Sequence, residues 1–115
     1  ESLLFAKSMG ADPSVVLSAI KDGMGGSAMM SLLGPKMVRG QYDPTIEARL
    51  HAKDVDIASR ASKQRGRAFP CLEVVLQNYR TIIEQGFGTR DTSVIQEIID
   101  EKSRISFNSD CDLEK

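Results

Sequence analysis

Apolar residues recur at every third or fourth position through most of the chain, which is the spacing of one helix face. The longest stripe of this kind follows Phe69-Pro70 and ends before Gly86. Strict alternation of apolar and polar residues, which is typical of strands, is missing from these segments. The pattern predicts an all-α fold of about six helices. The apolar residues of the longest stripe are Leu72, Val75, Leu76, Tyr79, Ile82 and Ile83.

Proline and glycine residues indicate where these helices begin and end. Gly10 ends a first segment, and Asp12-Pro13 then supplies an N-cap and a proline at the first helical position. That second helix is predicted to end at Gly23. Ser27 begins a short third helix, which Gly34-Pro35 is predicted to stop.

The pair Asp43-Pro44 is predicted to open the longest polar-apolar helix, which ends at Gly66. The final helix is predicted to begin at a cap formed by Asp91 or Ser93, with Gln96 completing a capping box after Ser93. The core face of the long helix is predicted to carry Ile46, Leu50, Val55, Ala58 and Ala61.

Length and composition are those of one globular domain. The chain has 115 residues, of which 41% are hydrophobic and 27% are charged. The formal net charge of -1 gives no basic surface of the kind that binds nucleic acids, so we expect no nucleic acid partner. The longest apolar run, from Leu3 to Ala6, has four residues, far short of the length of about 20 that a membrane span needs.

Few residues suggest metal or redox chemistry. Cys71 and Cys111 have no second cysteine or histidine at zinc-site spacing, so we interpret both as free thiols in a reducing, cytoplasmic compartment. The single histidine, His51, is interpreted as a surface residue because no nucleophile or carboxylate is placed beside it by spacing. We therefore expect no metal site.

A glycine-rich segment matches the relaxed dinucleotide pattern G-x-G-x-x-A from Gly23 to Ala28. A helix rather than a strand precedes it, and the segment that follows is too short for a parallel crossover. We therefore interpret Gly23 to Gly26 as a connection between helices. The four methionines around it fit either a core or a cleft lining, and they are Met24, Met29, Met30 and Met37.

Taken in order, the motifs of this chain resemble the C-terminal helical domain of the β-hydroxyacid dehydrogenases, over about Leu3 to Ile99. The group includes 3-hydroxyisobutyrate dehydrogenase, tartronate semialdehyde reductase and, more distantly, 6-phosphogluconate dehydrogenase. The motifs are Ala6-Lys7, Gly10-Ala11-Asp12-Pro13, Gly25-Gly26-Ser27, Gly34-Pro35-Lys36-Met37, Leu50-His51-Ala52-Lys53-Asp54-Val55, Phe69-Pro70-Cys71-Leu72, Tyr79, Gly86-Phe87-Gly88 and Asp91-Thr92-Ser93.

The resemblance implies an NAD- or NADP-dependent oxidoreductase that transfers a hydride between the nicotinamide and a small 2- or 3-hydroxy acid. In that family an upstream Rossmann domain binds most of the cofactor, and a joining helix carries the catalytic lysine in a G-x-x-x-K-x-x-N pattern. No such pattern occurs here. We therefore expect residues 1–102 to be the substrate-side and dimerisation domain, with 1–10 ending the joining helix and 103–115 forming a polar, flexible tail.

By this resemblance, Lys53 reaches toward the nicotinamide end of the cofactor and Asp54 orients its surroundings. The residue types alone would favour a solvated surface for this pair. Ser27 and Ala28 correspond to the substrate side, where several members carry an aromatic residue in place of Ala28; Leu33 replaces a tyrosine in the same way.

The resemblance also implies a homo-oligomer, at least a dimer, and a fragment that is inactive without its upstream half. It leaves the choice between NAD and NADP open, as well as the identity of the acid. Two alternatives come from other classes of protein. One is a free-standing helical interaction module without catalysis, and the other is a small regulatory domain that binds a carboxylate ligand.

Overall fold

The structure is a computed structural model that describes residues 1–104. Over these residues the chain forms six α-helices and one short 3-10 helix, with no strand, so the predicted all-α fold is confirmed. The helices are α1 (Ser2–Ser8), α2 (Pro13–Lys21), α3 (Ala28–Arg39), α4 (Ala48–Gln64), α5 (Pro70–Glu84), the 3-10 helix η1 (Thr92–Val94) and α6 (Ile95–Ser103). The predicted tail, 103–115, lies almost wholly outside the described residues.

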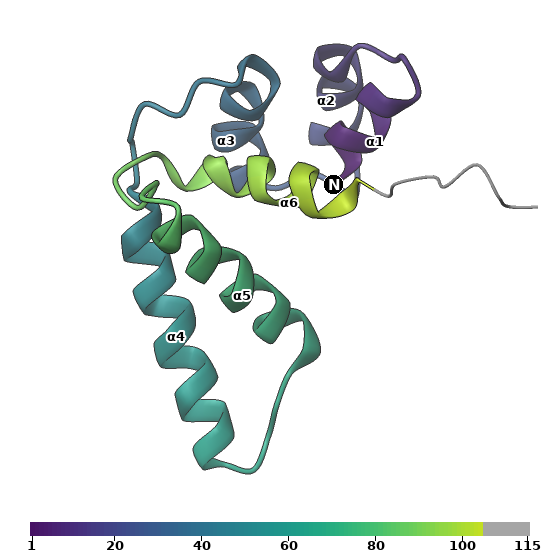
Figure 1. The fold of residues 1–115 in the computed structure, drawn as a ribbon. Coiled ribbons are helices and arrows are strands. Elements are labelled where there is room, and N and C mark those ends of the chain that lie inside the picture. Colours follow the sequence, from purple (N-terminus) through teal and green to yellow (C-terminus); the bar gives the residue numbers. More distant parts are fainter. Residues whose placement is uncertain (105–115) are drawn as a thin grey trace, which may run out of the picture.

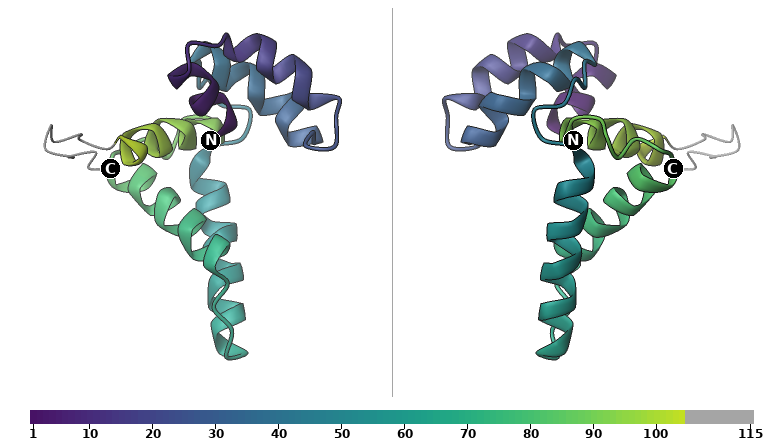
Figure 2. Two further views of the ribbon diagram at one scale, coloured as in Figure 1. Left: turned by 90° about the vertical axis from the view of Figure 1, so that its right-hand side faces the viewer. Right: turned by 90° about the vertical axis from the view of Figure 1, so that its left-hand side faces the viewer.

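Two groups of helices make up the molecule. The antiparallel helices α4 and α5 pack on one another and project away from the other helices, as Figure 1 shows. Helices α1, α2 and α3 form a separate group at the opposite end, and α6 crosses between the two groups in all views (Figures 1 and 2). The connection from α3 to α4 therefore joins the two groups.

The main hydrophobic core lies between α4, α5, η1 and α6 and includes no side chain of α1, α2 or α3. It consists of buried side chains from α4, α5, η1 and α6, with Tyr42 from the preceding loop packed against it. Helices α1 to α3 bury only a few side chains of their own, chiefly Leu3, Ala6, Leu17 and Leu33. The main core consists of Ala48, Tyr79, Ile82, Val94 and Ile98.

Several predicted helix ends are confirmed by their capping geometry. The Asp12 carboxylate accepts a hydrogen bond from Ser14 N at 2.8 Å, and Pro13 occupies the first turn of α2. Ser27 Oγ accepts from Met30 N at 3.0 Å at the start of α3. Helix α5 begins at Pro70 and ends before Gly86, whose φ of 77° is in the left-handed region that favours glycine.

Two predicted boundaries at proline are wrong. Helix α3 does not stop at Gly34-Pro35 but continues to Arg39, with Pro35 inside it. Gly34 has no Cβ to clash with the proline ring, which relieves the usual restriction on the residue before proline. Helix α4 begins at Ala48 rather than after Asp43-Pro44, because the residues before Ala48 pair with the segment around Asp91.

The predicted core face of α4 is also partly wrong. Leu50 is 49% exposed, and Ala58 and Ala61 are exposed as well. The buried positions of this helix are Ala48 and Ser59. Small side chains at these positions allow α5 to approach closely, and Ser59 Oγ donates to Glu73 on α5 at 2.6 Å.

The start of the last helix differs from the predicted capping box. Asp91 is the cap, because its carboxylate accepts from Ser93 N at 3.1 Å at the start of η1. Ser93 Oγ donates to the same carboxylate at 2.7 Å, so it does not cap α6. Helix α6 begins after Val94 with no side-chain cap.

Candidate functional site

Lys53 and Asp54 lie on the outer side of α4, away from the core. Their side chains are 66% and 65% exposed, and Lys53 Nζ is 3.6 Å from Asp54 Oδ1. An exposed ion pair of this length holds its partners weakly. The Lys53 ammonium can therefore leave Asp54 for a stronger anionic ligand without disturbing the fold.

Ser27 and Ala28 lie at the start of α3. Both are exposed, and Ser27 is the N-cap of this helix. The first N–H groups of a helix lack intrahelical partners, and the helix dipole adds partial positive charge there, so this end suits a carboxylate. Leu33, by contrast, is buried in the packing of α3 and does not face solvent.

The two predicted pairs therefore lie on different helices. Over residues 1–104 no hydrogen bond, ion pair or pocket joins Ser27 or Ala28 to Lys53 or Asp54. A site that uses all four would need a ligand or another protein surface between α3 and α4.

His51 is not the surface residue that the sequence suggested. It is half-buried, with Nδ1 2.7 Å from Thr92 Oγ1 and 3.3 Å from Tyr79 Oη. Tyr79 Oη lies 2.6 Å from Thr92 Oγ1, and burial raises the pKa of Tyr79 above its ordinary value of 10. Through Nδ1, His51 links α4 to Tyr79 of α5 and Thr92 of η1.

A largely buried ion pair, which the sequence did not predict, joins α3 to the start of η1. Lys36 Nζ donates to Asp91 Oδ2 at 2.7 Å, and the two side chains are 17% and 0% exposed. Lys36 also donates to Asp43 O at 2.6 Å and to Thr45 Oγ1 at 2.7 Å. Both residues belong to motifs quoted for the resemblance, which is the one signal that could have singled them out.

The Asp91 carboxylate accepts bonds from several directions. Besides Lys36, it accepts from Thr45 N at 2.8 Å, from Ile46 N at 3.4 Å, and from the amide and hydroxyl of Ser93. Burial acts to raise the pKa of Asp91, but the bonds from Lys36, Ser93 and Thr45 outweigh it and hold that pKa well below 3.8. Asp91 is therefore an ionised, fully partnered group rather than a proton donor.

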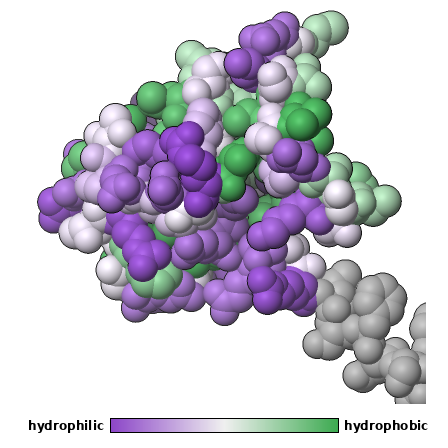
Figure 3. Space-filling model, turned by 90° about the horizontal axis from the view of Figure 1, so that it is seen from above, coloured by the Kyte–Doolittle hydropathy of each residue, from purple (hydrophilic) through white to green (hydrophobic). Residues whose placement is uncertain are grey.

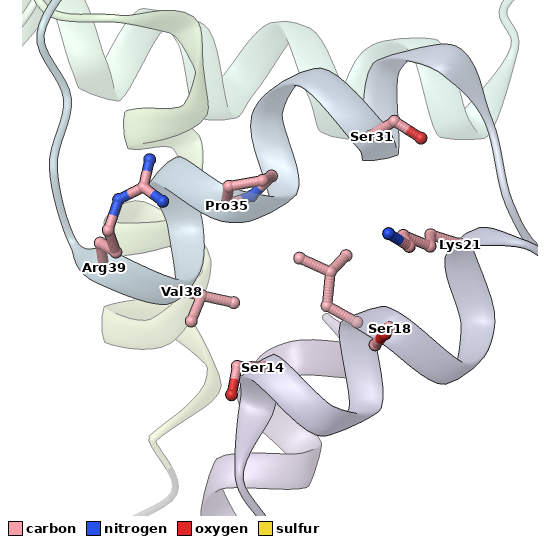
Figure 4. A pocket seen from close by; sticks show the side chains of 8 residues that line it. Ser14, Ser18, Lys21, Ser31, Pro35, Val38 and Arg39 are labelled. Atoms are coloured by element: carbon pink, nitrogen blue, oxygen red, sulfur yellow. The ribbon is translucent and has the colours of Figure 1, made fainter.

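A cleft of about 380 Å³ lies between α2 and α3, where no functional residue was predicted. Figure 4 shows Lys21 directed into this cleft, with Ser18 beside it on α2 and Ser31 across from it on α3. Arg39 lies at the other end. Neither cation forms an ion pair with another residue in the range 1–104, although Arg39 Nε donates to Gln41 Oε1 at 3.1 Å. Both charges are therefore available to an anion.

A second groove, of about 250 Å³, lies between α1, α3 and α6. Met29, Met30 and Met37 line it, so three of the four methionines belong to a surface groove, whereas Met24 is fully exposed. Seen from the side of α1 to α3, apolar surface lies among polar side chains (Figure 3). Gln96 also lines this groove, and its buried Oε1 has no hydrogen-bond partner among the described residues.

Three further features of the described residues concern metal ligands, membrane-spanning helices and free cysteines. Residues 1–104 contain no group of three or more histidine, cysteine or acidic side chains placed to hold a metal ion. No helix in this range is long and apolar enough to cross a membrane. Cys71 is an exposed free thiol, and Cys111 lies outside the described residues.

Comparison with known proteins gives consistent matches. The chain is 27% identical over 100 residues to 2-hydroxy-3-oxopropionate reductase of Escherichia coli (strain K12), covering 87% of this chain and 34% of that protein. It is 34% identical over 88 residues to probable 3-hydroxyisobutyrate dehydrogenase-like 2, mitochondrial, of Arabidopsis thaliana, covering 76% of this chain and 28% of the relative. The chain thus spans about a third of the length of the curated relatives it matches.

The fold is similar to a solved structure from the same group. The crystal structure of 3-hydroxyisobutyrate dehydrogenase from Salmonella typhimurium matches with a TM-score of 0.79 at 21% identity, covering 84% of this chain and 34% of that one. A family model described as "NAD-binding of NADP-dependent 3-hydroxyisobutyrate dehydrogenase" matches residues 1–99. On this evidence the chain belongs to the 3-hydroxyisobutyrate dehydrogenase-like family of β-hydroxyacid dehydrogenases.

Proposed function

We propose that this chain is the C-terminal, substrate-side domain of an NAD- or NADP-dependent dehydrogenase. The whole enzyme would transfer a hydride between the nicotinamide and a small 2- or 3-hydroxy acid of the 3-hydroxyisobutyrate or tartronate semialdehyde class. The observation that carries the proposal is the family match over 1–99, with Lys53 exposed on α4 at the position that the resemblance assigns to cofactor contact.

The residues of this chain fit a supporting role toward the cofactor. The exposed Lys53 ammonium, weakly held by Asp54, suits a phosphate or carboxylate in front of α4. The bound nicotinamide cofactor would supply the hydride acceptor or donor. Lys53 would bind and orient its charged part, and Asp54 would limit the excess positive charge when the site is empty.

The start of α3 fits a supporting role toward the substrate. The N–H groups beside the Ser27 cap offer donors to the carboxylate that every substrate of this class carries. Ala28 leaves room next to them, because a methyl group replaces a large aromatic side chain. We therefore propose that Ser27 and Ala28 help to position the carboxylate end of the acid.

We also propose that the chain alone is inactive, because catalysis requires cofactor and substrate to be held from both sides. In the same proposal the whole enzyme is a homo-oligomer, at least a dimer, that works in the cytoplasm.

The test is an assay of the gene product that includes the coding region upstream of Glu1. We expect that region to contain G-x-G-x-x-G after a strand and G-x-x-x-K-x-x-N just before Glu1. The product should oxidise NADH or NADPH with 2-hydroxy-3-oxopropionate, or reduce NAD or NADP with 3-hydroxyisobutyrate. A start codon close to Glu1 would contradict the proposal and favour a helical interaction module.

The cleft between α2 and α3 favours a second candidate function, a regulatory domain that binds a small carboxylate. Lys21 and Arg39 offer two cations without acidic partners in the described chain, and Ser18 and Ser31 add hydroxyl groups. This candidate expects carboxylates to raise the melting temperature of the 115-residue chain, with loss of the effect in Lys21→Gln. The dehydrogenase proposal places the carboxylate at Ser27 and Ala28, so it expects no dependence of any such effect on Lys21.

A further inference from the structure

The two helix groups share no common hydrophobic core. The main core contains side chains from α4, α5, η1 and α6, and none from α1, α2 or α3. Helices α3 and α4 both pack against η1. The angle between α3 and α4 therefore depends on what ties each of them to η1 and to the connection 40–47.

Asp91 ties this connection to η1 by its backbone as well as its carboxylate. Asp91 N donates to Tyr42 O at 2.8 Å, and Thr92 N donates to Ile46 O at 2.8 Å. Further along, Ala48 N donates to Arg90 O at 2.9 Å. Residues 42–48 are thus fixed to 90–92 right up to the first residue of α4.

Lys36 attaches α3 to this fixed segment. Its ammonium meets three acceptors, Asp43 O, Thr45 Oγ1 and Asp91 Oδ2, all within 2.7 Å. A lysine Nζ carries three donors, so every one is used. Lys36 thus links α3 directly to the segment that leads into α4.

We infer that Lys36 and Asp91 are positioning residues, which hold the Ser27 end of α3 in a fixed relation to Lys53 on α4. This inference rests on the proposed function, in which Ser27 faces the substrate and Lys53 faces the cofactor that reacts with it. Ser27 lies nine residues before Lys36 on the helix, a lever of about 14 Å at 1.5 Å per residue. A turn of about 10° at Lys36 would then move Ser27 by about 2 Å.

Such a displacement is large for a catalytic site. Misplacing a substrate by about 1 Å costs on the order of 100-fold in rate. The ion pair is expected to matter more for geometry than for stability, since a buried ion pair is often replaceable by neutral residues without loss of stability.

The test compares Lys36→Met/Asp91→Asn with the unaltered protein and with Lys36→Arg. The double variant leaves no unpaired buried charge, so it is expected to keep its helix content. The two native cysteines are first removed by Cys71→Ser and Cys111→Ser. Spin labels are then attached to cysteines introduced at two exposed positions, Ser31→Cys on α3 and Ala61→Cys on α4. The distance between the two labels reports how the two helix groups are arranged. We expect a broadened distance distribution in the double variant and a narrow one in Lys36→Arg.

An unchanged, narrow distribution in the double variant would overturn the inference. If the double variant loses helix content, the variant Thr45→Val is measured in its place. This substitution removes one acceptor of Lys36 and should broaden the distance distribution to a smaller degree. An unbroadened distribution in Thr45→Val would also overturn the inference.

In the whole enzyme we expect the double variant to lose about 100-fold in kcat/KM, mostly in kcat, with recovery in Lys36→Arg. An inactive unaltered enzyme would instead count against the proposed function and leave the distance result intact.

Discussion

Leu17 of α2 lies directly against the Cα of Gly34 in α3, so that a Cβ at Gly34 would come within 2.6 Å of Leu17 Cδ1 and 3.0 Å of Cδ2. Both residues are buried. The absence of a side chain at Gly34 is what lets α2 and α3 approach one another, and the same absence lets α3 continue into Pro35.

Gly34→Ala is therefore expected to destabilise the chain. Overpacking against Leu17 should outweigh the gain in helix propensity, for a net loss of about 1–2 kcal/mol in the free energy of unfolding. Urea denaturation, monitored by circular dichroism, measures this change in the free energy of unfolding. Ser31→Ala, at an exposed position on the same helix, is the control and should change little; equal stability of the two variants would contradict the packing argument.

Lys53→Ala should leave stability unchanged and impair the whole enzyme. The side chain is 66% exposed and its one ion pair is weak, so folding does not depend on it. Under the proposed function, KM for the nicotinamide cofactor should rise and Lys53→Arg should recover part of the loss. Arg60→Ala on the same helix is the matched control, and steady-state kinetics with unaltered values for Lys53→Ala would remove this lysine from the site.

Acid stability should depend strongly on Asp91. Its pKa is held below 3.8 in the folded chain, so the unfolded chain takes up a proton first as the pH falls. The stabilisation from Asp91 is complete above about pH 5 and is lost progressively below pH 4. Urea midpoints at pH 7, 5 and 3 should therefore fall less steeply in Asp91→Asn than in the unaltered chain. Glu84→Gln, at an exposed position, should keep the original slope.

Tyr79→Phe tests the hydrogen-bonded group of His51, Thr92 and Tyr79. Removing the buried hydroxyl should cost about 1 kcal/mol, because Thr92 then keeps only its bond to His51. Tyr42→Phe is the control, since the Tyr42 hydroxyl has no hydrogen-bond partner in the described part of the chain. A similar loss in both variants would indicate that the hydroxyl bond to Thr92 adds nothing.

Self-association is expected from the apolar groove between α1, α3 and α6. Leu4 and Met30 line it beside Ile95 and Ile99, and an apolar groove of this kind favours burial against another surface. Sedimentation equilibrium of the chain should show a species larger than the monomer, which Leu4→Glu shifts toward the monomer. Val74→Glu, at an exposed position on α5 outside the groove, is the control. A monomer at every concentration tested would contradict the oligomer proposal.

Local signals predicted the parts of the fold that depend on neighbouring residues. Phe69-Pro70 and Gly86 determine the ends of α5, and Asp12-Pro13 the start of α2, because caps and proline act within one turn. The start of α4 could not be predicted from local signals. The amides of Thr45 and Ile46 bond to Asp91, 46 and 45 residues further along, and no local pattern reveals that partner.

For the candidate site as well, local signals predicted some features, and others depend on contacts that only the fold creates. The exposure of Lys53 and Asp54 follows from their residue types, and their role came only from the resemblance. His51 was misjudged because its partners, Tyr79 and Thr92, come from other elements that fold against α4. Lys36 was overlooked for the same reason, since a lysine is usually exposed and only the fold supplies its acceptors.

Because the main core is confined to α4, α5, η1 and α6, the helices outside it should separate first when the chain partly unfolds. Helices α1 to α3 bury little apolar surface of their own, so less free energy opposes their separation than opposes loss of the core. Amide hydrogens of α2 and α3 should exchange with solvent through a partial opening, while those of Ile82 and Ile98 exchange only on global unfolding. Partial unfolding would thus begin in the helices next to Ser27, while the helix that carries Lys53 would stay folded until the whole chain unfolds.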